Sequence, residues 1–308
     1  MSTHPLPTLA TELVSMVTTV IGEVRPRLIE AALSGDHRNR VNKRHADNFL
    51  SDFDLLLHER YRDLITEVLP SFVYASEEAD PQVVGSDPDP DLCVLVDPLD
   101  TSEMAVRALY GYAHVMVYSR RLARPIAAVV GDFFHHLPLY MAVRDDDGSD
   151  RAILMTADGD QYPIQVGEET PLNEALVTNF LMKPDRFRYL AQQTPLFDEL
   201  ATPTEDGAKV GRIGADFGSI SLCHVATGFT DATIEILKGF AVWDLAPGHY
   251  ILQAAGGSVI DLDGNALPLD YGFGTLADIR HAMDRRQTFV AASSKSLAEA
   301  IVEKVREA

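Results

Sequence analysis

The chain has 308 residues, enough for one large domain or two medium ones, and 46% of them are hydrophobic, enough for a full core. Asp and Glu number 46 against 26 Lys and Arg, which gives a net charge of −20. A surface of this charge repels nucleic acid and anionic membranes, so neither is expected as a partner. It would also repel an anionic substrate, unless bound cations made the pocket locally attractive.

The two cysteines, Cys93 and Cys223, lie in apolar runs and are predicted to be small core residues, not a disulfide or a zinc site. Residues 1–7 carry no basic segment typical of a signal peptide. No apolar run approaches the roughly 18 residues of a membrane span. The sequence therefore predicts a soluble cytoplasmic protein.

Apolar residues at helical spacing predict two helices near the start of the chain, over residues 9–33 and 52–69. Thr8 or Thr11 is expected to cap the first helix, and Pro26 is expected to kink or divide it.

Short apolar runs bounded by turn residues predict strands in both halves of the chain. The expected strands cover residues 72–76, 92–96, 112–118, 126–134, 139–144, 175–178, 232–237 and 288–292. The later helices are expected over residues 189–200, 220–227, 244–255 and 294–307. An acidic, proline-rich stretch over 81–91 is expected to be an exposed loop. We therefore predict an α+β domain over residues 1–150 and an α/β domain over 151–308.

The most informative stretch is residues 92–102. Its apolar run leads directly into Asp97, Asp100 follows three residues later, and Thr101 and Ser102 come next. At about 4 Å and an effective dielectric of about 20, a pair of like charges costs about 4 kcal/mol. Two carboxylates at the end of a buried strand therefore indicate a divalent metal. The alternative is that Asp100 or Thr101 caps the helix that follows.

Two further motifs accompany this stretch: Glu77-Glu78 after an apolar run, and Trp243-Asp244-Leu245-Ala246-Pro247-Gly248 with Ala255-Gly256-Gly257. With Asp97-Pro98-Leu99-Asp100-Thr101-Ser102 they resemble, in order and spacing, the G-E-E, D-P-[IL]-D-G-[ST] and W-D-x-A-A-G…A-G-G motifs of the inositol monophosphatase family. The resemblance extends over residues 10–295. It implies a layered α-β-α-β-α sandwich of the inositol monophosphatase/fructose-1,6-bisphosphatase type, with the site at the junction of the two halves.

The resemblance implies a ligand set for two or three Mg²⁺ ions. It consists of the carboxylates of Glu77, Asp97, Asp100 and Asp244 and the main-chain carbonyl of Leu99. Mg²⁺ prefers such hard oxygen ligands, and four carboxylates cannot share a pocket in ionised form without cations. The alternative for Glu77 is a solvated pair with Glu78.

The family also couples a hydroxyl to an aspartate of an earlier T-x-x-D motif to orient the attacking water. Here the hydroxyl is that of Ser102, and Asp54 of Ser51-Asp52-Phe53-Asp54 would be the proton relay. Glu77 completes the implied catalytic set, and Lys43 stands where the family has a site lysine. The alternative for Asp54 is an acid in the first turn of a helix, favoured by the helix dipole.

The substrate contacts that the resemblance implies come from both halves of the chain. They are Asp100, Thr101, Ser102, Gly218, Ser219, Glu235 and Asp244. The backbone N–H groups that follow Asp100 would hold the phosphate, and Glu235 would bind a substrate hydroxyl.

Thr101 departs from the family, which has glycine there, and a β-branched residue disfavours positive φ. Three outcomes are open: an α-like backbone that makes Thr101 harmless, a shifted substrate, or reduced or lost activity. The segment from Glu235 to Asp244 is also two residues longer than in inositol monophosphatase, and Met104-Ala105 replaces Asn-Phe. Inositol phosphate is therefore not assumed as the substrate.

The leading hypothesis is a Mg²⁺-dependent phosphomonoesterase that hydrolyses a small sugar, cyclitol or polyol phosphate by attack of a metal-activated water. One alternative is a 3′(2′),5′-bisphosphate nucleotidase or fructose-1,6-bisphosphatase, and Leu99 is compatible with the nucleotidase branch. An alternative of another class is a non-catalytic homologue that binds a phosphorylated ligand. The resemblance further implies a homodimer and inhibition by lithium.

Overall fold

The computed structural model describes residues 6–35, 51–205 and 207–306. The chain forms two compact units, each with its own sheet and hydrophobic core. The first unit comprises Met1–Tyr162 and Leu269–Asp284, and the second comprises Pro163–Pro268 and Arg285–Ala308. The chain thus returns to the first unit late in the sequence.

The first unit is built on an eight-stranded sheet with the strand order β2-β1-β3-β4-β5-β6-β7-β8. Its strands are β1 (Ser71–Ser76), β2 (Ala79–Gly85), β3 (Leu92–Asp100), β4 (Tyr112–Ser119), β5 (Arg124–Asp132), β6 (Leu139–Arg144), β7 (Asp150–Met155) and β8 (Gln161–Pro163). β1 and β3 run parallel, whereas the other neighbouring pairs from β2 to β7 are antiparallel.

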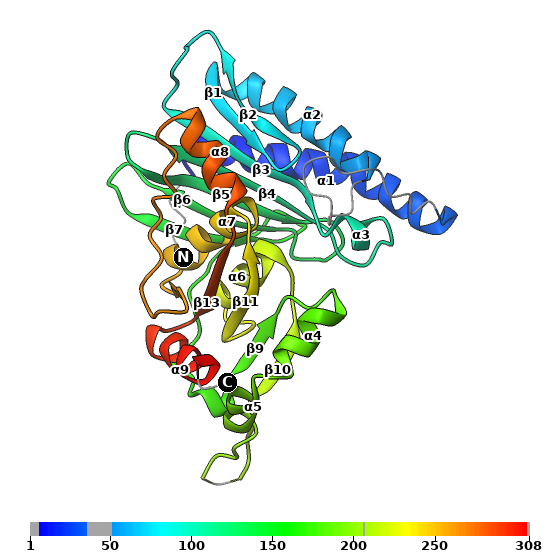
Figure 1. Cartoon of the computed structure of the whole chain (residues 1–308). Coiled ribbons are helices and arrows are strands. Elements are labelled where there is room, and N and C mark those ends of the chain that lie inside the picture. Colours follow the sequence, from blue (N-terminus) through cyan, green and yellow to red (C-terminus); the bar gives the residue numbers. More distant parts are fainter. Residues whose placement is uncertain (1–5, 36–50, 206, 307–308) are drawn as a thin grey trace. The chain divides into compact units, whose positions relative to one another are not determined.

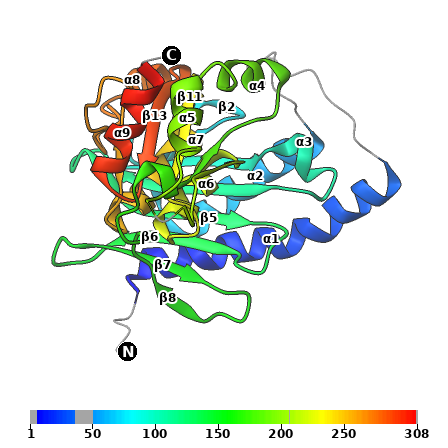
Figure 2. The ribbon, with the colours of Figure 1, turned by 90° about the horizontal axis from the view of Figure 1, so that it is seen from below.

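Two long helices, α1 (Thr8–Ser34) and α2 (Asp52–Val68), pack on this sheet, α1 against β5 and α2 against β3 (Figure 1). Figure 2 shows α1 next to β5. Buried residues of α1 recur every three or four positions, as expected for one apolar face: Leu13, Val17, Val20, Val24 and Leu28. A third helix, α3 (Ser102–Ala105), is a single turn after β3.

The expected cap of α1 is wrong. Pro7 occupies the N-cap position, Thr8 is already helical, and the hydroxyl of Thr11 donates to the Pro7 carbonyl instead. Pro7 has no side-chain acceptor, so α1 begins without a side-chain cap for its first N–H groups. Pro26 lies inside α1 without dividing it, and Gly35 ends the helix in the left-handed conformation.

The stretch over residues 81–91 is only partly a loop, because β2 extends from Ala79 to Gly85 and pairs with β1. β2 is the edge strand of the sheet, so a proline there costs no hydrogen bond on its open side. Pro81 and the acidic residues near it therefore led to the prediction of a loop where the structure has a strand.

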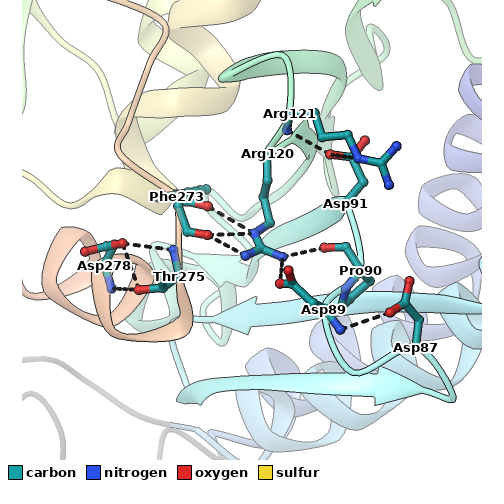
Figure 3. Close-up of polar contacts among 10 residues, drawn as sticks. Asp87, Asp89, Pro90, Asp91, Arg120, Arg121, Phe273, Thr275 and Asp278 are labelled. Carbon is teal, nitrogen blue, oxygen red and sulfur yellow. Dashed lines mark hydrogen bonds and ion pairs between the residues drawn. The ribbon is translucent and has the colours of Figure 1, made fainter.

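Arg120, which follows β4, binds the returning segment to the first unit (Figure 3). Its guanidinium donates to the carbonyls of Phe273 and Gly274, pairs with Asp89 at 2.7 Å and donates to the Pro90 carbonyl at 2.6 Å. These contacts precede α8 (Leu276–Asp284), which packs against β2.

The second unit has a five-stranded sheet with the order β10-β9-β11-β13-β12. The strands are β9 (Leu176–Asn179), β10 (Arg212–Ala215), β11 (Ala232–Phe240), β12 (Ser258–Ile260) and β13 (Gln287–Ala292). β9 runs parallel to β10 and β11, and β13 runs antiparallel to β11 and β12. Two packed helices, α6 (Gly218–Ala226) and α7 (Val242–Ala254), contact β11, and α9 (Lys295–Arg306) contacts β13.

The helix expected over 189–200 is two short helices, α4 (Pro184–Leu190) and α5 (Thr194–Leu200), after the 3₁₀ turn η1 (Leu172–Glu174). Pro195 explains the division, because it lacks an N–H and suits the first turn of a new helix. α7 begins two residues before the expected start, so Pro247 lies inside it and not in its first turn.

Cys93 and Cys223 are both buried and free, as the sequence predicted. Burial raises the pKa of the Cys93 thiol to about 12, so this group stays protonated. None of the helices in the described part of the chain is long and apolar enough to cross a membrane.

Candidate active site

A bulge in β3 brings Asp97 and Asp100 to the same neighbour. β3 was expected to end before Asp97, but it continues to Asp100, with Asp97 opposite His114 and Asp100 opposite Tyr112 on β4. In a regular strand, residues three apart face opposite sides. The extra residue of the bulge corrects this alternation, so His114 lies 3.7 Å from Asp97 (Nδ1 to Oδ2) and 3.5 Å from Asp100 (Nε2 to Oδ2).

Leu99 lies between the two acids and is nearly fully buried. Its N–H donates to Asp97 Oδ1 at 3.2 Å, which restrains that carboxylate. Its carbonyl, the predicted main-chain metal ligand, lies 3.0 Å from the Ser102 hydroxyl.

Ser102 and Asp54 meet from segments far apart in the sequence. The hydroxyl oxygen of Ser102 lies 2.6 Å from Asp54 Oδ1. Because one hydroxyl proton serves one acceptor at a time, the shorter contact shows that Ser102 donates chiefly to Asp54 and not to Leu99. The lone pairs of Ser102 then remain available to accept a hydrogen bond.

The other oxygen of Asp54 belongs to a capping box. Asp54 Oδ2 accepts from the N–H and from the hydroxyl of Ser51, both at 2.6 Å, and Phe53 N–H donates to Ser51 Oγ at 3.2 Å. Burial raises the pKa of Asp54 above its ordinary value, although the hydrogen bonds from Ser102 and Ser51 oppose the shift. Asp54 is therefore both an acid in the first turn of α2, bound to the N-cap Ser51, and the hydrogen-bond partner of Ser102, two interpretations that had been alternatives.

Thr101 has φ 61° and ψ 38°, in the left-handed region. The first open outcome, a right-handed α backbone that would make threonine harmless, is therefore wrong. A β-branched side chain in this region is strained by about 1–2 kcal/mol. The backbone keeps a conformation that glycine would adopt freely.

Glu77 comes directly after β1, and on the neighbouring strand β3 Asp97 comes directly after Val96. β1 and β3 run parallel with Ser76 opposite Val96, and Glu77 N–H donates to the Val96 carbonyl at 3.2 Å. The carboxyl end of β1 therefore brings the backbone of Glu77 beside that of Asp97 within the first unit.

In the second unit, Ser219 connects α6 to α7. Its hydroxyl donates to the Asp244 carbonyl at 2.6 Å and accepts from the Gly248 N–H at 3.1 Å. These two groups are the partners of a regular helical turn, and Pro247 beside them has no N–H to donate. Ser219 is fully buried, so this side chain supports the turn that carries Asp244. Gly218, the first residue of α6, has φ 40°.

Glu235 is almost completely buried, and both its oxygens have partners. Oε2 pairs with the Arg186 guanidinium, and Oε1 accepts from the N–H groups of Leu237, Lys238 and Gly239 at 3.0–3.2 Å. The predicted contact of Glu235 with a substrate hydroxyl stays a prediction. A substrate hydroxyl would have to compete with these four donors for the carboxylate oxygens.

Sequence reasoning missed Arg186 and His114. Arg186 lies in a helix with other polar residues, and no motif marked it. His114 had a signal: it is the one histidine in a run, 112–118, that is otherwise aliphatic and aromatic. Lys43, predicted as a site lysine, lies outside the described residues.

The oxygen donors of the first unit suit Mg²⁺. Asp97 and Asp100 contribute carboxylates near one imidazole, Leu99 contributes a carbonyl, and the backbone of Glu77 is adjacent. Hard oxygen ligands from a few carboxylates and a carbonyl are the set that Mg²⁺ takes in proteins. The residues present therefore fit the ion that the sequence predicted.

Comparison with known proteins identifies the family of the chain. The family model of the inositol monophosphatase family matches residues 4–308. The chain is 26% identical over 231 residues to inositol-1-monophosphatase of Caulobacter vibrioides, covering 73% of this chain and 80% of that protein. It is 26% identical over 219 residues to Nus factor SuhB of Pasteurella multocida, covering 71% and 73%.

Among solved structures, extragenic suppressor protein SuhB of Bartonella henselae matches with a TM-score of 0.68 at 16% identity, over 98% of this chain and 99% of that one. The chain therefore belongs to the inositol monophosphatase family and has its layered α/β sandwich fold. The predicted family and the predicted fold class are confirmed.

Proposed function

We propose that this protein is a Mg²⁺-dependent phosphomonoesterase that hydrolyses a small sugar, cyclitol or polyol phosphate. The observation that carries the proposal is the hydrogen bond of 2.6 Å between Ser102 and Asp54. Ser102 follows the proposed metal ligand Asp100 by two residues. A hydroxyl held by a buried carboxylate beside a cluster of metal-binding acids suits the orientation of an attacking water.

The proposed ions would be held by Glu77, Asp97, Leu99, Asp100 and Asp244. Bound Mg²⁺ supplies Lewis acidity, which neutralises charge on the phosphoryl oxygens and makes water a better nucleophile. The proposed site binds two or three ions, as the resemblance to the family implies.

The chain's own residues orient the water and hold its proton. Ser102 Oγ accepts a hydrogen bond from the water while its own proton points to Asp54 Oδ1. As the water oxygen bonds to phosphorus, the bond from phosphorus to the alcohol oxygen of the substrate breaks. The water proton passes to Ser102 Oγ, the Ser102 proton passes to Asp54, and the departing alkoxide takes a proton from solvent. The raised pKa of Asp54 favours its acting as the acceptor.

The substrate class is proposed more broadly than inositol phosphate. The printed names of relatives include inositol-1-monophosphatase, which supports a cyclitol phosphate. However, Arg186 already pairs with Glu235, the residue that would bind a cyclitol hydroxyl. Sugar phosphates, and the bisphosphorylated nucleotides or fructose 1,6-bisphosphate of the alternative readings, therefore belong in the substrate panel.

The competing candidate is a non-catalytic homologue that binds a phosphorylated ligand. Two observations favour it: the strained left-handed Thr101 at the expected phosphate loop, and relatives that carry the name Nus factor. The complete Ser102–Asp54 pair favours the enzyme, because a protein without turnover has no need of it.

The deciding experiment measures phosphate release from this panel while Mg²⁺ is titrated from zero. Asp97→Asn and Ser102→Ala are run in parallel. The proposal expects Mg²⁺-dependent release that Asp97→Asn reduces by orders of magnitude. Metal binding without release from any compound would overturn it in favour of the non-catalytic homologue.

A further inference from the structure

His114 is an unassigned side chain among the acids of the first unit. It lies on β4, directly opposite Asp97, and is fully buried. Its neighbours along the strand are apolar: Tyr112, Ala113, Val115 and Met116. A buried imidazole in such a run calls for a specific polar role.

The two ring nitrogens of His114 face two different carboxylates. Nδ1 lies 3.7 Å from Asp97 Oδ2, and Nε2 lies 3.5 Å from Asp100 Oδ2. Both separations are too long for a strong hydrogen bond. They are shorter than the distance of about 4.2 Å that two ligands can span across one ion with bonds of about 2.1 Å.

We infer that His114 is a ligand of the metal that Asp97 binds, through Nδ1, and that this nitrogen raises the affinity of the site for a transition metal such as Mn²⁺ relative to its affinity for Mg²⁺. Asp97 and His114 offer donor atoms close enough to share an ion. The inference rests on the metal site of the proposed function, and deepens it by naming a nitrogen ligand and the class of ion.

The arrangement of Asp100 supports this geometry. A histidine that binds a metal through one nitrogen usually directs its other N–H to a carboxylate, which fixes the ring. Nε2 lies 3.5 Å from Asp100 Oδ2, an electrostatic contact that favours the ring orientation in which Nδ1 lies beside Asp97. The bulge in β3 is what allows one imidazole to meet both acids.

The chemical consequence concerns metal selectivity. Carboxylates and carbonyls suit Mg²⁺ and Mn²⁺ alike, whereas imidazole favours the first-row transition metals, whose affinity for nitrogen rises along the Irving–Williams series. The nitrogen of His114 therefore raises the affinity for Mn²⁺ and Co²⁺ relative to Mg²⁺.

The test uses the full chain stripped of metal and loaded with Mn²⁺. Electron spin-echo modulation of bound Mn²⁺ reports nitrogen coupling directly, and calorimetry gives the affinities for Mn²⁺ and Mg²⁺. His114→Gln and His114→Ala are compared with His135→Ala, which removes an exposed imidazole at the end of β5. Asp97→Asn serves as the variant that weakens binding of both ions.

We expect nitrogen modulation in the wild-type protein and in His135→Ala, and its loss in both His114 variants. Mutation of a residue that only supports a metal ligand commonly lowers the metal affinity 10–100-fold. Loss of the His114 nitrogen ligand itself should therefore lower the ratio of Mn²⁺ to Mg²⁺ affinity at least about tenfold. If a His114 variant fails to fold, the wild-type spectrum still decides.

Mn²⁺ bound without nitrogen coupling would overturn the inference and make His114 a core residue that balances the charge of the acids. In that case, phosphate release with Mg²⁺ would leave the proposed function standing. Conversely, nitrogen-coupled Mn²⁺ without any phosphate release would support the inference and remove the proposed function.

Discussion

The Ser102 hydroxyl and the Asp54 carboxylate lie 2.6 Å apart, although 48 residues separate them in the sequence. Asp54 uses one oxygen for Ser102 and the other for the cap of α2. Its two functions can therefore be separated by substituting its partners instead of Asp54 itself.

We expect Ser102→Ala to lower kcat for phosphate release by about 10²–10⁴-fold, because the water loses its general-base contact. Ser51→Ala should instead lower the free energy of unfolding by about 1 kcal/mol through the lost cap, and keep most of the activity. Steady-state kinetics and urea unfolding of the two variants make the comparison. Equal losses of activity in both would contradict the separation.

Thr101→Gly should stabilise the protein slightly. The left-handed backbone costs threonine about 1–2 kcal/mol, while glycine adds about 0.5–1 kcal/mol of chain entropy to the unfolded state. Activity should stay equal or rise, because the phosphate loop keeps its backbone with less bulk.

The matched control for Thr101→Gly is Ala123→Gly, at φ 52° in the turn between β4 and β5. It should change thermal stability in the same direction and leave the KM for substrate unchanged. A lower activity of Thr101→Gly would mean that the threonine side chain itself serves the substrate.

Ser219→Ala should destabilise the turn that carries Asp244. It leaves the Gly248 N–H and the Asp244 carbonyl without the bridging hydroxyl, at a cost of about 1–3 kcal/mol. If Asp244 binds Mg²⁺ as proposed, the affinity for Mg²⁺ should fall as well.

Ser221→Ala is the control for Ser219→Ala, since the buried Ser221 hydroxyl donates within α6, to Gly218, at 2.7 Å. Mg²⁺ calorimetry should show a loss of metal affinity only for Ser219→Ala. Unfolding curves measure the loss of stability in each variant. An unchanged affinity in both variants would argue against Asp244 as a ligand.

His249 should make the protein sensitive to acid. Burial lowers the pKa of its imidazole from 6.5 to about 4. Between these values the unfolded chain binds the proton and the folded chain does not, so the free energy of unfolding falls as the pH drops from 6.5 to 4, by up to about 3 kcal/mol. Urea unfolding at several pH values in this range gives the free energy of unfolding at each pH. This free energy should change more steeply with pH in the wild-type protein than in His249→Gln.

The outcome that contradicts this prediction is a pH dependence of stability in His249→Gln equal to that of the wild-type protein. It would assign the acid sensitivity to other groups, chiefly buried carboxylates.

Local sequence patterns predicted much of the fold. The helix over 52–69 and the strand over 139–144 match α2 and β6, because apolar period and terminal residues act over a few positions. β2 and the division between α4 and α5 were missed. The first depends on which strand lies at the sheet edge, and the second on where a proline begins a new helix.

The sequence by itself determined the family and predicted the candidate acids, since Asp97, Asp100 and Asp54 stand in motifs whose order and spacing are readable along the chain. Tertiary structure alone decided what these acids touch. The bulge after Asp97 turns both carboxylates toward His114, and packing of α2 on β3 brings Asp54 to Ser102. Pairing register and helix packing arise from contacts between distant segments, so no local pattern records them.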